Sequence, residues 1–279
     1  MLLKTISEYH QQVKTISPKA IGLVPTMGAL HKGHLSLMKN ALKDCDCVVV
    51  SIFVNPTQFN SSSDLDKYPR TIDEDLKLIE KLDQNILVYV PSVEEIYPDG
   101  IQSTHFDFGE LSKFMEGEFR HGHFNGVGTV LKRLFQLLKP QRAYFGEKDY
   151  QQLAVVKRLV KLTGQPVEII GCETYREDNG LAKSSRNTLL TEEEKTKAGI
   201  IYDQLQSVKT YLGVKSIAEI KKMVNQAFDS SKSFRLEYIE IAAEKDLVPT
   251  EKIEPHKNYR AFIAVYCNGV RLIDNMALN

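Results

Sequence analysis

The chain lacks the features that mark several broad classes of protein. Its 36 Lys and Arg residues balance its 36 Asp and Glu residues, so the formal net charge is zero, and no overall charge favours nucleic acid or an anionic membrane as a partner. No apolar run approaches the ~18 residues that cross a bilayer, and the N-terminus turns polar too early for a signal peptide. We therefore expect a soluble cytoplasmic protein without a nucleic-acid or membrane partner.

Cysteine is also scarce. The four cysteines, at positions 45, 47, 172 and 267, include no CxxC pair, and they are too few for the disulfide framework of a secreted protein. Reduced thiols in a cytoplasm are the simplest interpretation. A length of 279 residues with 42% hydrophobic content allows a sizeable core, either in one large domain or in a large domain with a small one.

The first part of the chain alternates between two apolar patterns. Short runs rich in β-branched residues predict buried strands at 20–25, 47–53, 86–90 and 167–172. Between these runs, apolar residues recur at helical spacing. Strands that alternate with helices favour right-handed crossovers and a parallel sheet covered on both faces. We therefore predict a doubly wound α/β domain, which binds ligands at the carboxyl ends of its strands.

The pattern changes after about residue 175. Two helical stretches, near 191–205 and 215–228, are followed by alternating strand patterns at 234–242 and 259–267. Helices followed by strands indicate a second, smaller α+β domain. We place the two domains at residues 1–175 and 176–279.

The stretch PTMGALHKGH, residues 25–34, joins the first strand to a helix. Unpaired backbone N–H groups and the positive end of the helix dipole can hold an anion there. Gly33 leaves room for a phosphate at the backbone, and His31 and His34 can donate hydrogen bonds beside it. Two histidines without a recognisable third ligand argue against zinc. The alternative is a capped helix with surface histidines.

Two later segments carry cations and hydroxyls. FGEKDYQQL (145–153) contains Lys148 and Asp149 after a predicted strand, and LAKSSRN (181–187) combines a lysine, two serines and an arginine. Each alone is also typical of a solvated turn or a capped helix start. Together they supply what a triphosphate needs opposite a helix N-terminus.

Polar groups also follow the second predicted strand, in FVNPTQF (53–59). The amides of Asn55 and Gln58 suit the hydroxyls and carboxylate of a hydroxy acid, although they could also cap local turns. Farther on, Asp73, Glu74 and Asp75 fit the first turn of a helix, and one of them could reach a magnesium ion bound to phosphates.

Taken in order, PTMGALHKGH, FVNPTQF, YPRT, GHFNGV, FGEKDYQQL, LAKSSRN and RLIDN resemble the pantoate–β-alanine ligases along nearly the whole chain. The HIGH/KMSKS nucleotidyltransferases are similar only in the histidine motif and the serine-rich loop. The resemblance implies a Rossmann-like N-terminal domain, a smaller C-terminal domain that closes over the nucleotide, and a homodimer. It also implies that pantoate and β-alanine are joined with ATP and Mg²⁺, through a pantoyl adenylate, with release of AMP and pyrophosphate.

The resemblance further implies roles for residues at matching positions. Catalytic roles are implied for His31, His34, Lys148, Ser184, Ser185 and Arg186. Contact with ATP is implied for Met27, Gly28, Ala29, Leu30, His31, Lys32, Gly33, His34, Gly146, Glu147, Lys148, Asp149, Tyr175, Lys183, Ser184, Ser185 and Arg186. Contact with pantoate is implied for Gln58 and Gln152, with β-alanine for Gln58, and with the substrate end of the site for Asn55. The protein ligands of magnesium are not identified.

The chain departs from the family pattern at a few positions. Lys183 stands where members often carry methionine or leucine, His121 stands in place of a proline, and Asn125 often corresponds to a charged residue. His123 keeps its family position and could either support the site or simply pack. The changes at His121 and Asn125 touch no residue with a proposed chemical role, whereas Lys183 makes its loop one charge richer and could contact a phosphate.

Two other functions remain as alternatives. A nucleotidyltransferase that transfers AMP to a phosphorylated acceptor would need a site for the acceptor's phosphate in place of the paired glutamines. A nucleotide-sensing module without turnover would have lost a catalytic motif, and none is lost. In the ligase, the attacking carboxylate has no proton to give up, so we expect His34 to stabilise charge rather than to transfer a proton.

Overall fold

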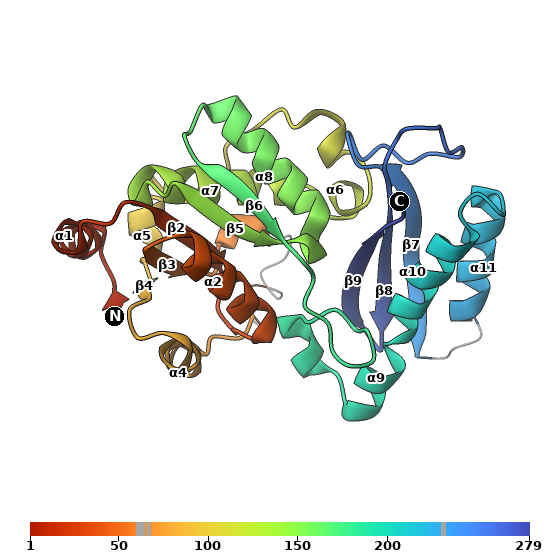
Figure 1. Ribbon diagram of the computed structural model, residues 1–279, viewed down its shortest axis with the longest axis horizontal. Coiled ribbons are helices and arrows are strands. Elements are labelled where there is room, and N and C mark those ends of the chain that lie inside the picture. Colours follow the sequence, from red (N-terminus) through yellow and green to blue (C-terminus); the bar gives the residue numbers. More distant parts are fainter. Residues whose placement is uncertain (60–64, 66–67, 230–232) are drawn as a thin grey trace. The chain divides into compact units, whose positions relative to one another are not determined.

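The computed structural model describes residues 1–59, 65, 68–229 and 233–279, which divide into two units (Figure 1). Unit 1 comprises Met1–Phe108, Arg120–Glu147 and Gln152–Glu173, and unit 2 comprises Gly109–Phe119, Lys148–Gln151 and Thr174–Asn279. Two segments that precede the predicted boundary near residue 175 therefore group with unit 2, and that boundary stays a prediction. Among the described residues, no helix has the length and apolar character needed to cross a bilayer.

A six-stranded parallel sheet forms the centre of unit 1. The strands, in sheet order, are β1 (Leu2–Leu3), β4 (Leu87–Tyr89), β3 (Cys47–Ile52), β2 (Ile21–Thr26), β5 (Arg142–Gly146) and β6 (Glu168–Cys172). The chain passes from β2 outward to β3 and β4, and later from β5 outward to β6, so the strand order reverses between β2 and β5. Open α/β sheets bind ligands at such a reversal.

The helices of unit 1 cover both faces of this sheet, which confirms the doubly wound prediction. On one face, α2 (Lys32–Asp44) and α4 (Ile72–Leu82) share a hydrophobic core with β2 and β3. Figure 1 shows α7 (His123–Leu138) and α8 (Tyr150–Thr163) on the other side of the sheet. The predicted strands correspond to β2, β3, β4 and β6 with small shifts at their ends. The remaining helices of unit 1 are α1 (Ile6–Ile16), α5 (Val93–Ile96) and η1 (Pro56–Gln58), whereas η3 (Glu147–Asp149) has Glu147 in unit 1 and its other two residues in unit 2.

Helix α1 is not among the helices that apolar periodicity predicts. Its signal is a capping box, in which the Thr5 side chain accepts a hydrogen bond from the Glu8 backbone N–H and the Glu8 carboxylate accepts one from the Thr5 backbone N–H. Such a pair satisfies two of the unpaired N–H groups at a helix start.

Unit 2 contains a three-stranded antiparallel sheet with helices, as the α+β prediction requires. Its strands, in the order β7-β8-β9, are β7 (Phe234–Ala243), β8 (Tyr259–Cys267) and β9 (Val270–Ala277). The helices are α6 (Glu116–Phe119), α9 (Glu192–Lys197), α10 (Ile200–Tyr211), α11 (Ile217–Asp229), η2 (Gly109–Ser112) and η4 (Ser185–Leu189). Leu205 of α10 and Phe228 of α11 are buried in one core with Ile263 of β8.

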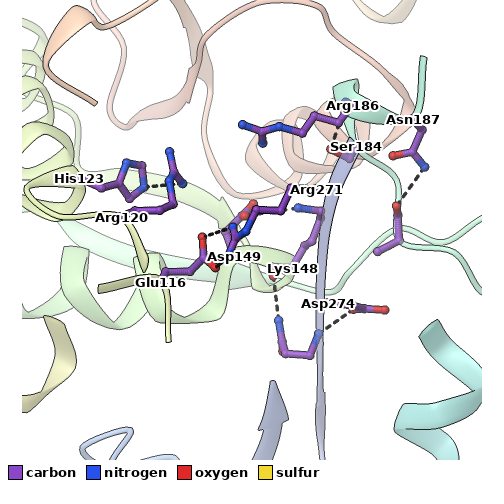
Figure 2. Close-up of polar contacts among 12 residues, drawn as sticks. Glu116, Arg120, His123, Lys148, Asp149, Ser184, Arg186, Asn187, Arg271 and Asp274 are labelled. Carbon is purple, nitrogen blue, oxygen red and sulfur yellow. Dashed lines mark hydrogen bonds and ion pairs between the residues drawn. The ribbon is translucent and has the colours of Figure 1, made fainter. Parts of the chain in front are cut away.

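An ion pair attaches the 109–119 segment to β9 within unit 2. The Arg271 guanidinium donates to both carboxylate oxygens of Glu116, at 2.6 and 2.9 Å, and also to Glu237 at 2.6 Å. Figure 2 shows the Arg271 and Glu116 side chains facing each other. Because bidentate arginine–carboxylate pairs fix direction as well as distance, this contact explains why a segment so far from β9 in sequence groups with it.

In unit 1, a glycine lets α7 approach the segment that follows β3. A β-carbon at Gly126 would lie only 2.1 Å from the main-chain oxygen of Thr57. The Gly126 oxygen also accepts a hydrogen bond from Asn55 Nδ2 at 3.1 Å. This close contact fixes the position of the segment that carries the two candidate substrate amides.

We expect Gly126→Ala to lower the free energy of unfolding by about 1–3 kcal/mol, because the added methyl meets backbone atoms that no side-chain rotation can move aside. At an open helical position the same change would stabilise the protein by roughly 0.5–1 kcal/mol. Urea denaturation at neutral pH shows whether the free energy of unfolding falls or rises. A stabilised variant would contradict the close approach of α7 to Thr57.

Candidate functional site

The helix α2 begins with two histidines that cap each other's backbone. His31 Nδ1 accepts a hydrogen bond from the Gly33 N–H at 3.1 Å, and His34 Nδ1 accepts one from the His31 N–H at 3.3 Å. The two rings are stacked, with centroids 4.0 Å apart. A ring nitrogen that accepts from a backbone N–H carries no proton, so in the neutral rings the proton lies on Nε2 of both residues. The predicted anion corner therefore has two stacked imidazoles that donate through Nε2.

A buried carboxylate from α4 holds the loop that precedes these histidines. Asp75 is only 1% exposed, and its oxygens accept hydrogen bonds from the Ala29 N–H at 3.0 Å and the Leu30 N–H at 2.7 Å. Burial raises the pKa of Asp75, while these two backbone donors lower it. The loop residues Gly28 and Ala29 both have positive φ angles, 84° and 51°, and for alanine that conformation is strained. Asp75 thus offsets the strain of the loop with two charge-assisted hydrogen bonds.

Sequence reasoning missed this use of Asp75. It grouped Asp73, Glu74 and Asp75 as one acidic first turn, any of which could reach magnesium. In the structure, the Asp75 carboxylate is bound by the backbone N–H groups of Ala29 and Leu30, whereas Asp73 and Glu74 are exposed. Helical spacing could have separated them, because Asp75 lies on the same face as Ile72 and Ile79.

After β3, a network of amides fixes the candidate substrate segment. Asn55 is 1% exposed. Its Nδ2 donates to Gln58 Oε1 at 2.9 Å. Its Oδ1 accepts from the Tyr97 hydroxyl at 2.5 Å, and it also accepts from the Thr57 N–H, which caps η1. Asn55 therefore orients the half-buried Gln58 amide, with Oε1 toward Asn55. The cap is present as the alternative interpretation expected, and contact of Asn55 with substrate stays a prediction.

The histidine of the GHFNGV motif supports the same segment. His123 is buried, and Arg120 Nη1 donates to His123 Nε2 at 3.1 Å (Figure 2). Since a guanidinium can only donate, the His123 proton lies on Nδ1, which donates to the main-chain oxygen of Gln58 at 3.1 Å. Of the two roles left open for His123, support of the site is the one that its contacts favour.

In unit 2, the serine-rich loop follows a short hairpin. The Lys183 N–H donates to the Tyr175 oxygen at 2.9 Å, and the Lys183 ammonium forms an ion pair with Glu177. The side chain of Ser184 caps η4 by accepting from the Arg186 N–H at 3.2 Å. Within the described part of the chain, the half-buried Arg186 guanidinium has no hydrogen-bond or ion-pair partner. Arg186 is therefore better prepared than Lys183 to meet an anion.

Two neighbouring glutamines at the start of α8 differ in their use. Gln151 is 4% exposed, and its amide donates to the oxygens of Leu111 and Phe114 and accepts from the Glu116 N–H. Gln151 thus holds the 109–119 segment in unit 2. Gln152, the one that the family resemblance implies for pantoate, is half-buried in unit 1.

The predicted site residues fall into one group in each unit. In unit 1, the segments 27–34 and 55–58 follow β2 and β3, and residues 146–147 lie at the end of β5. These three strands are adjacent, and their carboxyl ends share one edge of the sheet. Unit 2 carries Lys148, Asp149, Tyr175, Lys183, Ser184, Ser185 and Arg186. No set of three or more His, Cys, Asp or Glu side chains among the described residues could hold a metal ion.

Comparison with known sequences gives one family. A family model for Pantoate-beta-alanine ligase matches residues 1–277. The pantothenate synthetase of Christiangramia forsetii is 53% identical over 269 residues, which cover 96% of this chain and 95% of that protein. The pantothenate synthetase of Flavobacterium psychrophilum is 51% identical, with 93% of this chain and 92% of that protein covered.

Solved structures agree with the sequence comparison. A pantothenate synthetase from Thermus thermophilus has a TM-score of 0.91 and 40% identity, with 99% of each chain covered. A pantoate-beta-alanine ligase from Francisella tularensis, complexed with beta-gamma ATP and beta-alanine, has a TM-score of 0.82 and 37% identity, with 100% of this chain and 97% of that chain covered. The likeness therefore extends over both units and includes sequence as well as fold.

We expect Asp75→Asn to lower the free energy of unfolding by about 1–3 kcal/mol, because an amide nitrogen would face one of the two backbone N–H donors and leave it unsatisfied. Asp73→Asn makes the same change at an exposed carboxylate in the same turn, and it should alter stability by less than about 0.5 kcal/mol. Urea denaturation of both variants provides the measurement. Equal effects would show that Asp75 does not hold the loop.

Proposed function

The chain belongs to the pantoate-beta-alanine ligase family and is an enzyme that joins pantoate to β-alanine; we propose that it does so with ATP, through a pantoyl adenylate, and that it releases AMP and pyrophosphate. The observation that carries the proposal is the histidine corner beside the reversal of strand order. There, a helix N-terminus and two Nε2–H donors can meet a phosphate. The complex of the Francisella tularensis relative with beta-gamma ATP and beta-alanine supports ATP as a substrate.

In the first step, a pantoate carboxylate oxygen attacks the α-phosphorus of ATP. The new oxygen–phosphorus bond forms as the bond to the β-phosphate breaks, and pyrophosphate leaves with the electron pair. Negative charge grows on the α-phosphate oxygens, so fixed donors aimed at them stabilise the transition state. His31 and His34 can donate as neutral rings, and a proton added at Nδ1 would break the caps that hold them. We therefore assign both to charge stabilisation.

The unit 2 residues have a complementary proposed role. Lys148, Ser185 and Arg186 would contact the phosphates as charge moves to the departing pyrophosphate. Lys183 would contribute less, because its ammonium is already paired with Glu177. Ser184 would act mainly through the cap that shapes the loop.

Magnesium fits this proposal as a cation that arrives with ATP. Mg²⁺ in such sites keeps several waters and is bound through substrate phosphates and only one or two carboxylates, so the chain needs no cluster of its own. Since Asp75 is committed to the loop, Asp73 and Glu74 are the residues of that turn that would hold it. When bound, Mg²⁺ would neutralise charge on the outer phosphates.

In the second step, the amine of β-alanine attacks the acyl carbon of the mixed anhydride. A carbon–nitrogen bond forms, the carbon–oxygen bond to the phosphate breaks, and AMP leaves. The amine proton departs to water or to an AMP oxygen. Gln58, oriented by Asn55, would hold pantoate and then β-alanine, and Gln152 would hold pantoate.

The homodimer and the cytoplasmic location remain predictions that rest on the family resemblance and the composition. The nucleotidyltransferase and the nucleotide sensor gain no support, because the relatives described above are named as pantothenate synthetases or pantoate-beta-alanine ligases.

The order of the two steps can be tested by rapid quench. With α-labelled ATP, Mg²⁺ and pantoate but no β-alanine, the enzyme should form about one labelled pantoyl adenylate and one pyrophosphate per site and then stall, because the enclosed intermediate is kept from water. Added β-alanine should discharge the adenylate to pantothenate and AMP. Absence of both burst products, in protein that makes pantothenate when β-alanine is present, would rule out the stepwise mechanism.

His34→Asn tests the donor separately from the cap. Asparagine places Oδ1 where His34 has Nδ1, so the cap persists, but the Nε2 donor is lost. Turnover should fall by ~10²–10³-fold, the effect of removing one transition-state donor, while the free energy of unfolding stays close to that of the unmodified protein. His256→Asn, at an exposed histidine, is the matched control. Near-normal turnover in folded His34→Asn would remove this imidazole from the chemistry.

A further inference from the structure

The RLIDN segment, residues 271–275, is part of the family resemblance, and apart from the Arg271 ion pair its residues have no role described above. It lies on β9, and Asp274 and Asn275 are both only 4% exposed. Buried polar side chains on a strand are costly unless each hydrogen-bonding group has a partner. Their partners include the Lys148 main chain and Arg176, which lies in the hairpin before the serine-rich loop.

Asn275 holds the main chain of Lys148. Its Nδ2 donates to the Lys148 oxygen at 2.8 Å, and its Oδ1 accepts from Arg260 Nη1 at 2.6 Å. With both ends of the amide engaged, its orientation is fixed.

Arg260 of β8 strengthens the same attachment. Its guanidinium lies 3.8 Å from the ring centroid of Tyr150, the first residue of α8, and its Nε donates to Glu244 at 2.9 Å. The segment around Lys148 is therefore held at two points, at Lys148 by Asn275 and at Tyr150 by Arg260. Two such contacts leave its backbone little freedom.

Asp274, the preceding residue, holds the hairpin that leads to the serine-rich loop. Arg176 donates to both Asp274 carboxylate oxygens, at 2.6 and 3.0 Å, and also to the Gly180 oxygen at 2.9 Å. The Asn275 N–H donates to Asp274 Oδ1 at 2.8 Å. Adjacent residues of one strand thus fix two segments that α8 and β6 separate in sequence but that act on one ligand in the proposed function.

We propose that Asn275 is a positioning residue that sets the place of Lys148 for the adenylation step. The inference rests on the proposed contact of Lys148 with ATP. A lysine on a flexible stem reaches a phosphate productively only if its backbone is fixed, and small misplacements of a catalytic group can lower rates strongly. Asn275 acts through the Lys148 carbonyl and needs no contact with substrate.

Asn275→Asp is the sharpest test. It keeps the acceptor for Arg260 but replaces the donor to the Lys148 oxygen with a second acceptor. We expect kcat/KM for ATP to fall by at least about tenfold, while discharge of preformed adenylate by β-alanine keeps its rate. Asn225→Asp is the matched control, because exposed Asn225 also donates through Nδ2 to a main-chain oxygen, that of Lys221, at 2.9 Å. Equal loss in both half-reactions would overturn the inference in favour of general damage to the fold.

A double-mutant cycle identifies the route of the effect. If Asn275 acts through Lys148, then Asn275→Asp added to Lys148→Ala should cause little further loss, whereas independent effects would multiply. Multiplied effects would overturn the inference. If Lys148→Ala alone leaves ATP kinetics unchanged, the proposed role of Lys148 fails instead. Should Asn275→Asp not fold, Asn275→Ala enters the same cycle with the same expected outcomes.

Discussion

Loops at the ends of strands carry backbone N–H and C=O groups that no sheet ladder can satisfy, and the organisation of both units depends on how these groups find partners. In unit 1, Asp75 accepts from Ala29 and Leu30, and His31 and His34 each accept from the backbone of the same corner. In unit 2, the Lys148 carbonyl oxygen accepts a hydrogen bond from Asn275 Nδ2. Within each unit, the side chains that satisfy these loops therefore fix the conformation of the loops.

This requirement divides the motif residues into two groups. Some side chains hydrogen-bond to backbone groups, as Asn55 does at the start of η1 and Ser184 does at the start of η4. Others remain available for a ligand, as the half-buried Arg186 guanidinium does within the described part of the chain. Because the histidines hold the backbone through Nδ1, the same residues can do both, with Nε2 left as the donating nitrogen. A short motif can thus be structural and chemical at once.

Much of the fold was accessible from local pattern. The β-branched runs identified β2, β3 and β4, which are buried and continuously apolar, and also β6, which is an edge strand with only Cys172 buried. The two-residue β1 is too short to leave a pattern. The segments that the motifs single out lie mostly just after strands, and their role in a site stays a prediction. The sequence did not show which residues of these segments hold the backbone and which do not. Gln151 and Gln152 are neighbours in sequence, yet a helix turns them by about 100°, so one clamps the 109–119 segment while the other lies on a different face.

The sequence by itself determined the fold class and the family, because apolar periodicity and the order of motifs are local properties of the chain. Only the tertiary structure decided that Asp75 serves a loop 45 residues earlier in the chain, that His123 supports Gln58, and that the last strand holds Lys148. These contacts join residues far apart in sequence, and a hydrogen bond between them exists only after the sheets bring their elements together. The type of a residue limits which bonds it can make, but the fold selects its partner.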